Sequence, residues 1–278
     1  TPLSETVGAE ITGLDISEPL SPEIVADAQA AFERHHMLLF RGFDLSSEQQ
    51  ARFARYFGGT SQRELNKQTV ENDDNQYVSN TRPDGIFGKG ELDFHIDQLF
   101  LEEPLKALIL FAVEIPEHGG GTKFLNTQAV YDAMPDTLRD RLQGLKCRHA
   151  RAYDKKTSSD WNVVDADVDS PSWIHPLLWP NPRNGRHAIW VNKLTTLGIE
   201  DMEVDESAEL IAEVRSHFYN KDFAYEHDWR TGDLILWDNL VLQHARLPFD
   251  PNVTRTLRRT AILRVPPRRM PARRFAVR

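Results

Sequence analysis

Amphipathic runs dominate the first sixty residues of the chain, and short apolar runs dominate the rest. Residues 21–36 and 46–59 repeat apolar side chains at helical spacing, and each run opens with a serine suited to cap a helix, Ser21 and Ser46. The apolar run 36–43 between them has the length of a buried strand. The pattern therefore predicts a helix–strand–helix unit at the front of the chain.

Most later elements are predicted strands, because they are apolar or alternating runs bounded by Gly, Pro, Asn or Asp. Helical patterns interrupt them only at 127–145 and 205–220. Strands and helices do not alternate regularly, so a doubly wound parallel sheet is not expected. We expect a mainly β protein with helical additions (α+β) and a jelly-roll core, a common frame for metal sites. The predicted strands lie at 76–80, 105–116, 117–126 after a glycine turn, 146–153, 173–179, 186–192, 223–229, 233–239 and 257–265.

No internal repeat or low-complexity linker divides the 278 residues, so we expect a single domain over 1–278. Residues 154–172 are polar, acidic and without hydrophobic period. This segment is predicted to form a lid loop over a site, with an ordinary variable surface loop as the alternative.

Composition narrows the class of protein. The net charge of −9 argues against nonspecific nucleic-acid binding, and no apolar run approaches the roughly 18 residues that span a membrane. The first residues lack the basic start and apolar centre of a signal peptide. The single cysteine, Cys147, excludes a disulfide framework and a cysteine-rich zinc site. We expect a cytoplasmic protein without nucleic-acid or membrane partners, whose metal, if any, is held by histidine and carboxylate.

The stretch DFHIDQLF at 93–100 places two polar, metal-capable side chains in an apolar frame. If it is extended, His95 and Asp97 lie on one face of the strand. An imidazole and a carboxylate presented together are two of the three ligands of a non-haem ferrous iron. The pair alone is equally compatible with a surface ion pair, so a third ligand is required.

A second constellation lies near the end of the chain. His244 ends an apolar run, and Arg255 follows it by 11 residues. Residues 255–278 contain nine arginines and no acid. A buried arginine binds a carboxylate through two parallel hydrogen bonds, whereas a solvated basic tail needs no ligand. Taken singly, His244 also fits a core histidine and Arg255 a surface arginine.

Together, HIDQLF, GGGTKFLN, WDN…QH and the arginine eleven residues after that histidine resemble the taurine dioxygenase family of iron(II)- and 2-oxoglutarate-dependent oxygenases. The front helix–strand–helix unit matches as well, so the resemblance covers most of the chain. Thr122 follows His95 by 27 residues, a spacing that also agrees with the family. The resemblance implies a double-stranded β-helix core, Fe²⁺, 2-oxoglutarate as cosubstrate, and O₂.

The resemblance also implies roles for individual residues. His95, Asp97 and His244 would be the iron ligands. Thr122 and Arg255 would bind the distal carboxylate of 2-oxoglutarate, a charge that needs a partner in an apolar cavity.

The substrate contacts implied by the resemblance begin with Arg259, which matches the place where taurine-type enzymes hold an anionic group. Gln98 and Phe100, just past the metal block, are further candidates. Arg258 and Arg246 are weaker ones, and strand alternation allows only one of 258 and 259 to face the cavity.

Two departures from the family pattern bear on the substrate, and a third, at Gly121, is minor. Residues 61–76 contain no histidine where taurine users have one, and Phe94 stands where tryptophan is frequent. Both argue against taurine itself. Gly121 replaces an acidic residue.

The sequence thus predicts an enzyme that oxidises, by default hydroxylates, a C–H bond of a small anionic substrate while 2-oxoglutarate is decarboxylated to succinate and CO₂. A homo-oligomer is expected. Two alternatives stay open at this point: a non-catalytic metal-binding jelly roll, and a zinc hydrolase using the same His, Asp and His. Neither explains Thr122 with Arg255.

Overall fold

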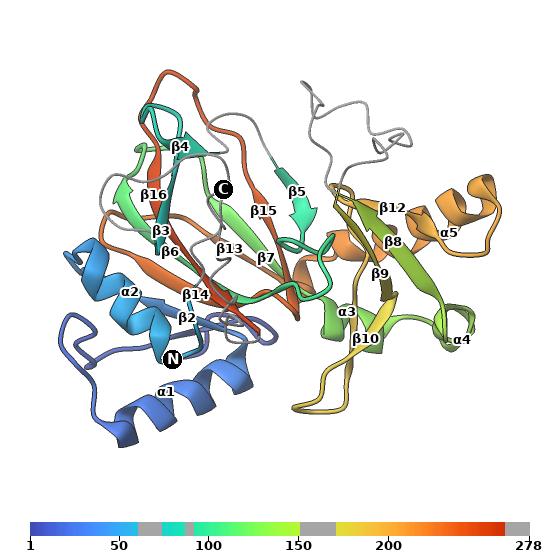
Figure 1. The fold of residues 1–278 in the computed structure, drawn as a ribbon, viewed down its shortest axis with the longest axis horizontal. Helices are drawn as coiled ribbons and strands as arrows, with labels where there is room; N and C mark the ends of the chain where they lie inside the picture. The colour runs from blue at the N-terminus through green and yellow to red at the C-terminus, as the bar shows by residue number, and fades with distance from the viewer. Residues whose placement is uncertain (61–73, 87–91, 151–170, 265–278) are drawn as a thin grey trace, which may run out of the picture.

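The computed structural model describes residues 1–60, 74–86, 92–150 and 171–264, and two facing β-sheets form its main body (Figure 1). The larger sheet has seven strands, in the order β1 (Ala9–Glu10), β2 (Met37–Phe40), β14 (Leu234–Asp238), β6 (Leu105–Glu114), β16 (Thr256–Leu263), β3 (Asn75–Ser79) and β4 (Gly85–Ile86). The smaller sheet has four, in the order β13 (Ala224–His227), β7 (Thr122–Asn126), β15 (Leu242–Arg246) and β5 (Leu92–His95). Neighbours are antiparallel except β1 with β2 and β3 with β4.

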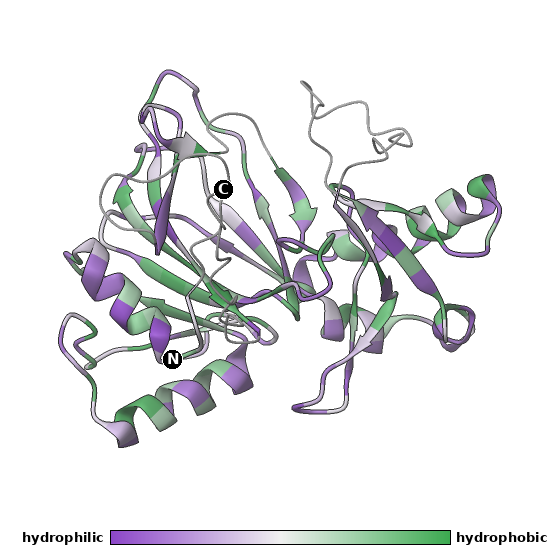
Figure 2. Cartoon of the chain, in the orientation of Figure 1, coloured by the Kyte–Doolittle hydropathy of each residue, from purple (hydrophilic) through white to green (hydrophobic). Residues whose placement is uncertain are grey.

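Strands β2 and β14 of the large sheet are buried on both faces, which explains why their sequences, MLLF and LILW, are continuously apolar (Figure 2). In β2, Met37 and Leu39 enter the core between the two sheets. Leu38 and Phe40, on the opposite face, pack in the core beneath the front helices. Because successive side chains of a strand point to opposite faces, β2 contributes to two separate hydrophobic cores.

Two front helices cover the outer face of the large sheet. Helix α1 (Pro22–His35) begins at Ser21, whose side chain accepts from the Ile24 N–H, as predicted. Helix α2 (Ser47–Arg55) begins with a capping box between Ser46 and Gln49. It ends at Arg55, short of the predicted glycine stop.

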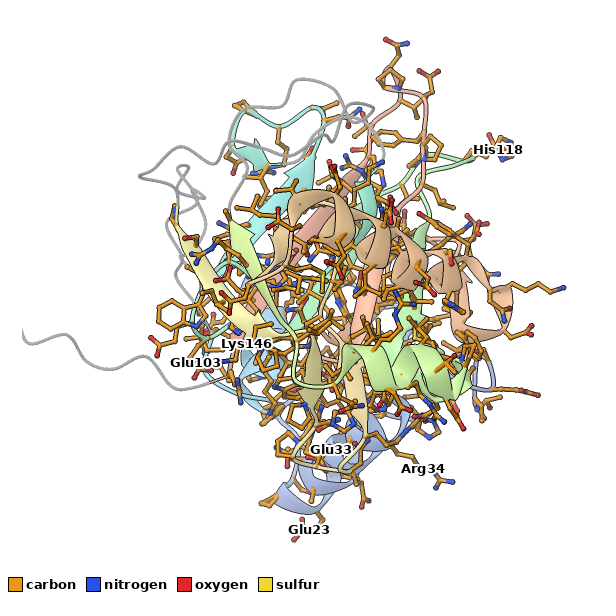
Figure 3. All side chains as sticks on the ribbon, turned by 90° about the vertical axis from the view of Figure 1, so that its right-hand side faces the viewer. Glu23, Glu33, Arg34, Glu103, His118 and Lys146 are labelled. Atoms are coloured by element: carbon orange, nitrogen blue, oxygen red, sulfur yellow. The ribbon has the colours of Figure 1, made fainter. Side chains whose placement is uncertain are left out.

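The outer surface of α1 is charged, as an amphipathic helix requires. Figure 3 shows Glu23 and Arg34 directed away from the body of the molecule. The inner surface contributes Ala28 and Phe32 to the core under the large sheet.

A second layer packs on the outer face of the small sheet, where Phe94, Leu125 and Ala245 join its apolar cluster. It contains the three-stranded sheet β12–β8–β9 and the two-stranded sheet β10–β11. The bounds are α3 (Thr127–Ala133), α4 (Asp136–Leu142), β8 (Lys146–Ala150), β9 (Ser172–Pro176), β10 (Leu178–Pro180), β11 (His187–Ile189), β12 (Thr196–Ile199), α5 (Val204–Ser216), η1 (His217–Tyr219) and η2 (Lys221–Phe223).

The mainly β prediction with a jelly-roll core and helical additions is confirmed. Several details differ. The predicted strand 173–179 is two strands, β9 and β10, and β12 was not predicted because TLGI carries little strand signal. The expected lid loop lies outside the described residues except for its last two, and Ser172 already belongs to β9. Within the described residues, none of the helices is long and apolar enough to cross a membrane.

Candidate active site

Three predicted ligands meet where β5 and β15 pair. His244 on β15 lies directly across from His95 at the end of β5, and their ring centroids are 4.1 Å apart. Asp97 Oδ1 lies 3.3 Å from His95 Nε2 and 3.8 Å from His244 Nε2. All the ligand atoms lie within 4.8 Å of one another. His95 and His244, 149 positions apart in sequence, are thus brought together by an antiparallel strand pair.

The route by which Asp97 reaches this point differs from the expectation. Strand β5 stops at His95, and Asp97 lies in the turn that follows, so strand alternation is not what joins the two side chains. Gln98, the next residue, has a positive φ of 62°. The Asp97 backbone instead bonds to the side chain of Asn239, which accepts from its N–H at 2.9 Å. A side chain replaces the missing strand neighbour.

The donor chemistry of this cluster fits a divalent cation. His95 Nδ1 contacts the Asp93 carbonyl at 2.8 Å. Because a carbonyl only accepts, Nδ1 is the donor in this contact, and the other ring nitrogen, Nε2, is turned toward the Asp97 carboxylate. Burial, with a smaller effect of His95, lowers the pKa of His244 to about 3, so its ring is neutral near pH 7. Two imidazole nitrogens and a carboxylate oxygen converge, a donor set that suits ferrous iron.

The second oxygen of Asp97 is already engaged. Arg259 Nη2 donates to Asp97 Oδ2 at 2.6 Å, and Arg259 Nη1 donates to Gln76 at 3.1 Å. Burial alone would raise the pKa of Asp97, but the Arg259 charge and the His95 hydrogen bond outweigh burial and lower it. Asp97 therefore stays ionised and turns Oδ1 toward the imidazoles.

Thr122 and Arg255 are both buried, 3% and 2% exposed. Thr122 begins β7, and its Cα partner on β15 is Arg246, two residues beyond His244. Its Oγ1 accepts from Trp229 Nε1 at 2.9 Å, so its own O–H can donate to a ligand. Trp229 was not singled out from sequence, because nothing in the pattern separates a tryptophan that orients a hydroxyl from one that only packs.

Arg255 is a buried cation whose recorded hydrogen bond is to a backbone carbonyl rather than to a carboxylate. Its Nε donates to the Gly120 carbonyl at 2.9 Å. Among the described residues, no carboxylate lies within 4.0 Å of its guanidinium. Burial, assisted by the charge of Arg246, lowers its pKa to about 9. A charge held this way calls for an anionic partner.

The glycine turn before β7 makes room for that guanidinium. Gly120 has a φ of +69°, and a Cβ there would lie 2.8 Å from Arg255 Nε. Only glycine adopts this conformation at such close approach without strain. Gly120 of the GGG motif is thus required because a side chain there would collide with Arg255.

Arg246 is a second buried arginine at this end of β15. It is 7% exposed, and burial lowers its pKa to about 10. Its guanidinium and that of Arg255 lie 5.9 and 5.6 Å from the centre of the Phe249 ring. Two positive groups therefore lie near the same aromatic ring, and one of them, Arg246, is the strand partner of Thr122.

The two adjacent arginines of β16 point to opposite faces, as alternation predicted. Arg258 donates to Gln50 at 2.7 Å on the helix side of the sheet, so it is not a site residue. Arg259 faces the ligand cluster. Gln98 is buried, and among the described residues its Oε1 has no hydrogen-bond partner. Phe100 is half-buried in the same turn.

Comparisons with known proteins agree with this geometry. The family model described as taurine catabolism dioxygenase TauD, TfdA family matches residues 1–261. Pentalenolactone F synthase of Streptomyces avermitilis is 29% identical over 92% of this chain and 91% of its own length. The (S)-phenoxypropionate/alpha-ketoglutarate-dioxygenase of Sphingobium herbicidovorans is 30% identical, over 90% of this chain and 89% of its own.

A solved structure shares the whole fold. The taurine dioxygenase of Burkholderia xenovorans aligns with a TM-score of 0.79 and 25% identity, covering 94% of this chain and 88% of that one. The family model and these relatives each extend over nearly the entire length. The chain therefore belongs to the taurine dioxygenase family, and it is a 2-oxoglutarate-dependent dioxygenase that uses Fe²⁺ and O₂.

Proposed function

We propose that this dioxygenase hydroxylates a C–H bond of a small anionic substrate and converts 2-oxoglutarate to succinate and CO₂. His95, Asp97 and His244 hold the iron, which supplies the redox chemistry when bound. The observation that carries the proposal is the buried Arg255 guanidinium, which has no carboxylate partner among the described residues. It is held by the turn before β7, the strand that pairs with the His244 strand of the ligand cluster. A hydrolytic zinc site or a metal store has no use for such a cation.

The cosubstrate pocket is built from three elements. Arg255 provides the charge for the distal carboxylate of 2-oxoglutarate, and Thr122 provides a hydroxyl donor whose acceptor side is already taken by Trp229. The Gly120 carbonyl holds the Arg255 side chain in place. These groups bind and orient the cosubstrate, and their burial excludes water from it.

Arg259 is the candidate receptor for the substrate's anion. It lies on the metal side of β16, and its charge reaches Asp97 directly. The named substrates of two relatives, a phenoxypropionate and taurine, each carry an anionic group. Gln98 and Phe100, in the turn after Asp97, are the proposed further contacts.

The proposal is tested with purified protein under anaerobic conditions. Fe(II) with 2-oxoglutarate should produce a weak visible charge-transfer band, and His95→Ala should abolish it. Succinate release is then measured over a panel of carboxylates, sulfonates, sulfate esters and amino acids. No band with metal and 2-oxoglutarate both bound would refute the proposal, and a panel in which uncharged analogues work equally well would refute an anionic substrate.

A further inference from the structure

Asp97 needs support that its own strand does not provide. Strand β5 ends at His95, and the connection to β6 runs as a turn that begins at Asp97. The positive φ of Gln98 makes this turn conformationally unfavourable for a residue with a side chain. Buried backbone groups in such a turn must find partners outside the strand ladder.

One buried carboxamide provides those partners. Asn239 Oδ1 accepts from the Asp97 N–H at 2.9 Å, and Asn239 Nδ2 donates to the Asp97 carbonyl at 3.1 Å. The same Nδ2 donates to the Leu105 carbonyl at 2.9 Å. The side chain thus pairs with both backbone groups of Asp97, as a neighbouring strand would. It also joins the two ends of the 97–105 connection.

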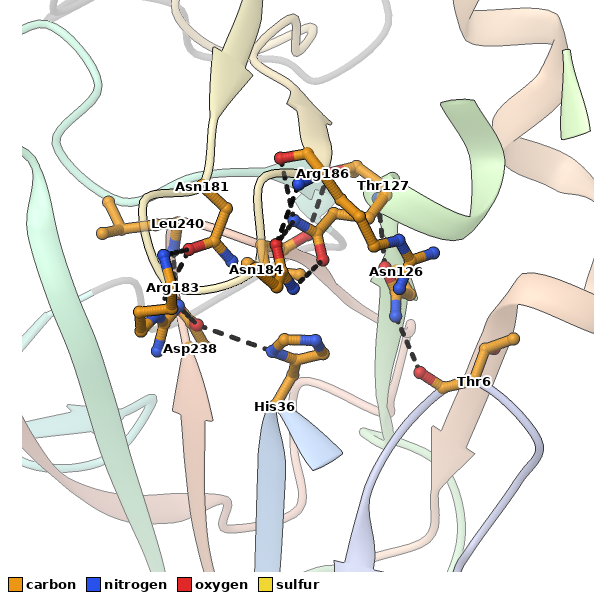
Figure 4. A network of polar contacts seen from close by, with 12 residues as sticks. Thr6, His36, Asn126, Thr127, Asn181, Arg183, Asn184, Arg186, Asp238 and Leu240 are labelled. Carbon is orange, nitrogen blue, oxygen red and sulfur yellow. Dashed lines mark hydrogen bonds and ion pairs between the residues drawn. The ribbon is translucent and has the colours of Figure 1, made fainter. Parts of the chain in front are cut away.

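Asn239 itself is held on a rigid base. Its backbone N–H donates to the Lys106 carbonyl at 3.1 Å, and its side chain is fully buried. The preceding residue, Asp238, lies 3.6 Å from His36 and is paired with Arg183 (Figure 4). The two side chains of this turn therefore have separate contacts: Asp238 joins the turn to the surrounding frame, and Asn239 reaches the proposed metal ligand.

We propose that Asn239 is a positioning residue that fixes Asp97 Oδ1 relative to His95 and His244. This inference rests on the proposed metal site. The two histidines are set by strand pairing, whereas Asp97 is not, so the geometry of the third ligand depends on Asn239. Removing a residue that hydrogen-bonds to a metal ligand typically lowers metal affinity by roughly 10- to 100-fold.

The residue type is specific. Asn239→Asp keeps an acceptor for the Asp97 N–H but turns an oxygen toward the Asp97 and Leu105 carbonyls. Asn239→Ala leaves all three backbone groups without their partner. Asn126 provides a matched control, since it is 3% exposed, accepts from two backbone N–H groups, and donates to the Thr6 carbonyl (Figure 4). None of these hydrogen bonds is to a candidate metal ligand.

The test is a titration of metal-free protein with Co(II), without 2-oxoglutarate, followed by the visible ligand-field absorption. Asn239→Ala and Asn239→Asp should each weaken Co(II) binding by at least about 10-fold. Asn126→Ala should bind Co(II) with an affinity within about twofold of that of the unaltered protein. Its melting temperature should fall by about as much as that of the Asn239 variants. If Asn239→Ala does not fold, the isosteric Asn239→Asp decides.

Unaltered Co(II) affinity in the Asn239 variants would overturn the proposal. Equal weakening in Asn126→Ala would overturn it too, because the effect would then be general destabilisation. His95→Ala separates this inference from the proposed function. If that variant binds Co(II) normally, the metal-site assignment is wrong and the positioning role fails with it. If it loses Co(II) while the Asn239 variants do not, only the positioning role fails.

Discussion

At the scale of single residues, burial decides the chemistry of the site. His244 is kept neutral by burial, and Asp97 is kept ionised because Arg259 outweighs the cost of burial. Arg255 stays charged with no acid beside it among the described residues. Each group is therefore in the protonation state that metal or carboxylate binding requires before any ligand arrives.

Arg255→Met should raise the Kd for 2-oxoglutarate far more than it alters iron content. Removing one partner of a buried charge pair costs about 2–5 kcal/mol, which is roughly 30- to 4000-fold in affinity. The measurement is a titration of the charge-transfer band with 2-oxoglutarate, alongside iron analysis. Arg141→Met, at an exposed arginine paired with Glu213, serves as the control. Equal losses of iron and 2-oxoglutarate in Arg255→Met would show that its role is misassigned.

Arg246→Met should weaken 2-oxoglutarate binding less than Arg255→Met does. The second guanidinium beside Phe249 adds positive potential to the pocket without being the assigned partner of the carboxylate. A nearby charge that is not the direct partner of the carboxylate contributes about 1 kcal/mol to binding, or roughly fivefold in affinity. The same titration measures it, and the effect should shrink in an Arg255→Met background. An unchanged Kd would mean that the Arg246 charge does not reach the ligand.

At the scale of elements, strands position the two histidines, Thr122 and Arg259, whereas Asp97 is positioned outside the strands. His95 and His244 are opposite each other in the β5–β15 register. Asp97 and Gly120 lie in turns, where backbone conformation and side-chain hydrogen bonds set the position. Helix caps and buried strands were predictable because they depend on neighbours in sequence, as Ser46 with Gln49 illustrates.

Strand β8 contains a buried histidine, His149, that should make the stability of the fold depend on pH. Burial, with a contribution from His175, lowers the pKa of His149 to about 3. The unfolded chain binds a proton near pH 6.5 that the folded chain does not, so this residue destabilises the fold as pH falls from about 6.5 toward 3. At pH 5 the difference is about 2 kcal/mol.

His149→Gln should therefore reduce the loss in free energy of unfolding as the pH falls from 7 to 5. Urea unfolding of the metal-free protein at pH 7 and pH 5 measures it, and the gap between the two pH values should narrow by up to about 2 kcal/mol. His118→Gln, at a 90% exposed side chain, is the control. An unchanged gap in His149→Gln would contradict a buried, neutral His149.

At the scale of the whole molecule, the site ties the two faces of the jelly roll together. The small sheet contributes His95 and His244, while Arg259 comes from the large sheet and contacts Asp97 across the interior. Ligand binding at this junction should stabilise the entire fold, because a ligand that binds only the folded state shifts the unfolding equilibrium.

Co(II) should accordingly raise the melting temperature of the metal-free protein. At 100 times its Kd the stabilisation is about 2.7 kcal/mol. Thermal unfolding with and without Co(II) measures the shift, and a chelator should reverse it. His244→Ala should show no shift. A shift that persists in His244→Ala would place the stabilising metal elsewhere.

The sequence by itself determined the mainly β class, the front helix–strand–helix unit and the identity of the three candidate ligands. These depend on local periodicity, capping and motif spacing, which are written in the order of residues. Tertiary structure alone decided that Asp97 leaves the strand, that Asn239 holds it, and that Trp229 orients Thr122. Those contacts join residues more than 100 positions apart. Only the packed sheets bring such residues within hydrogen-bond distance, so no local pattern could predict them.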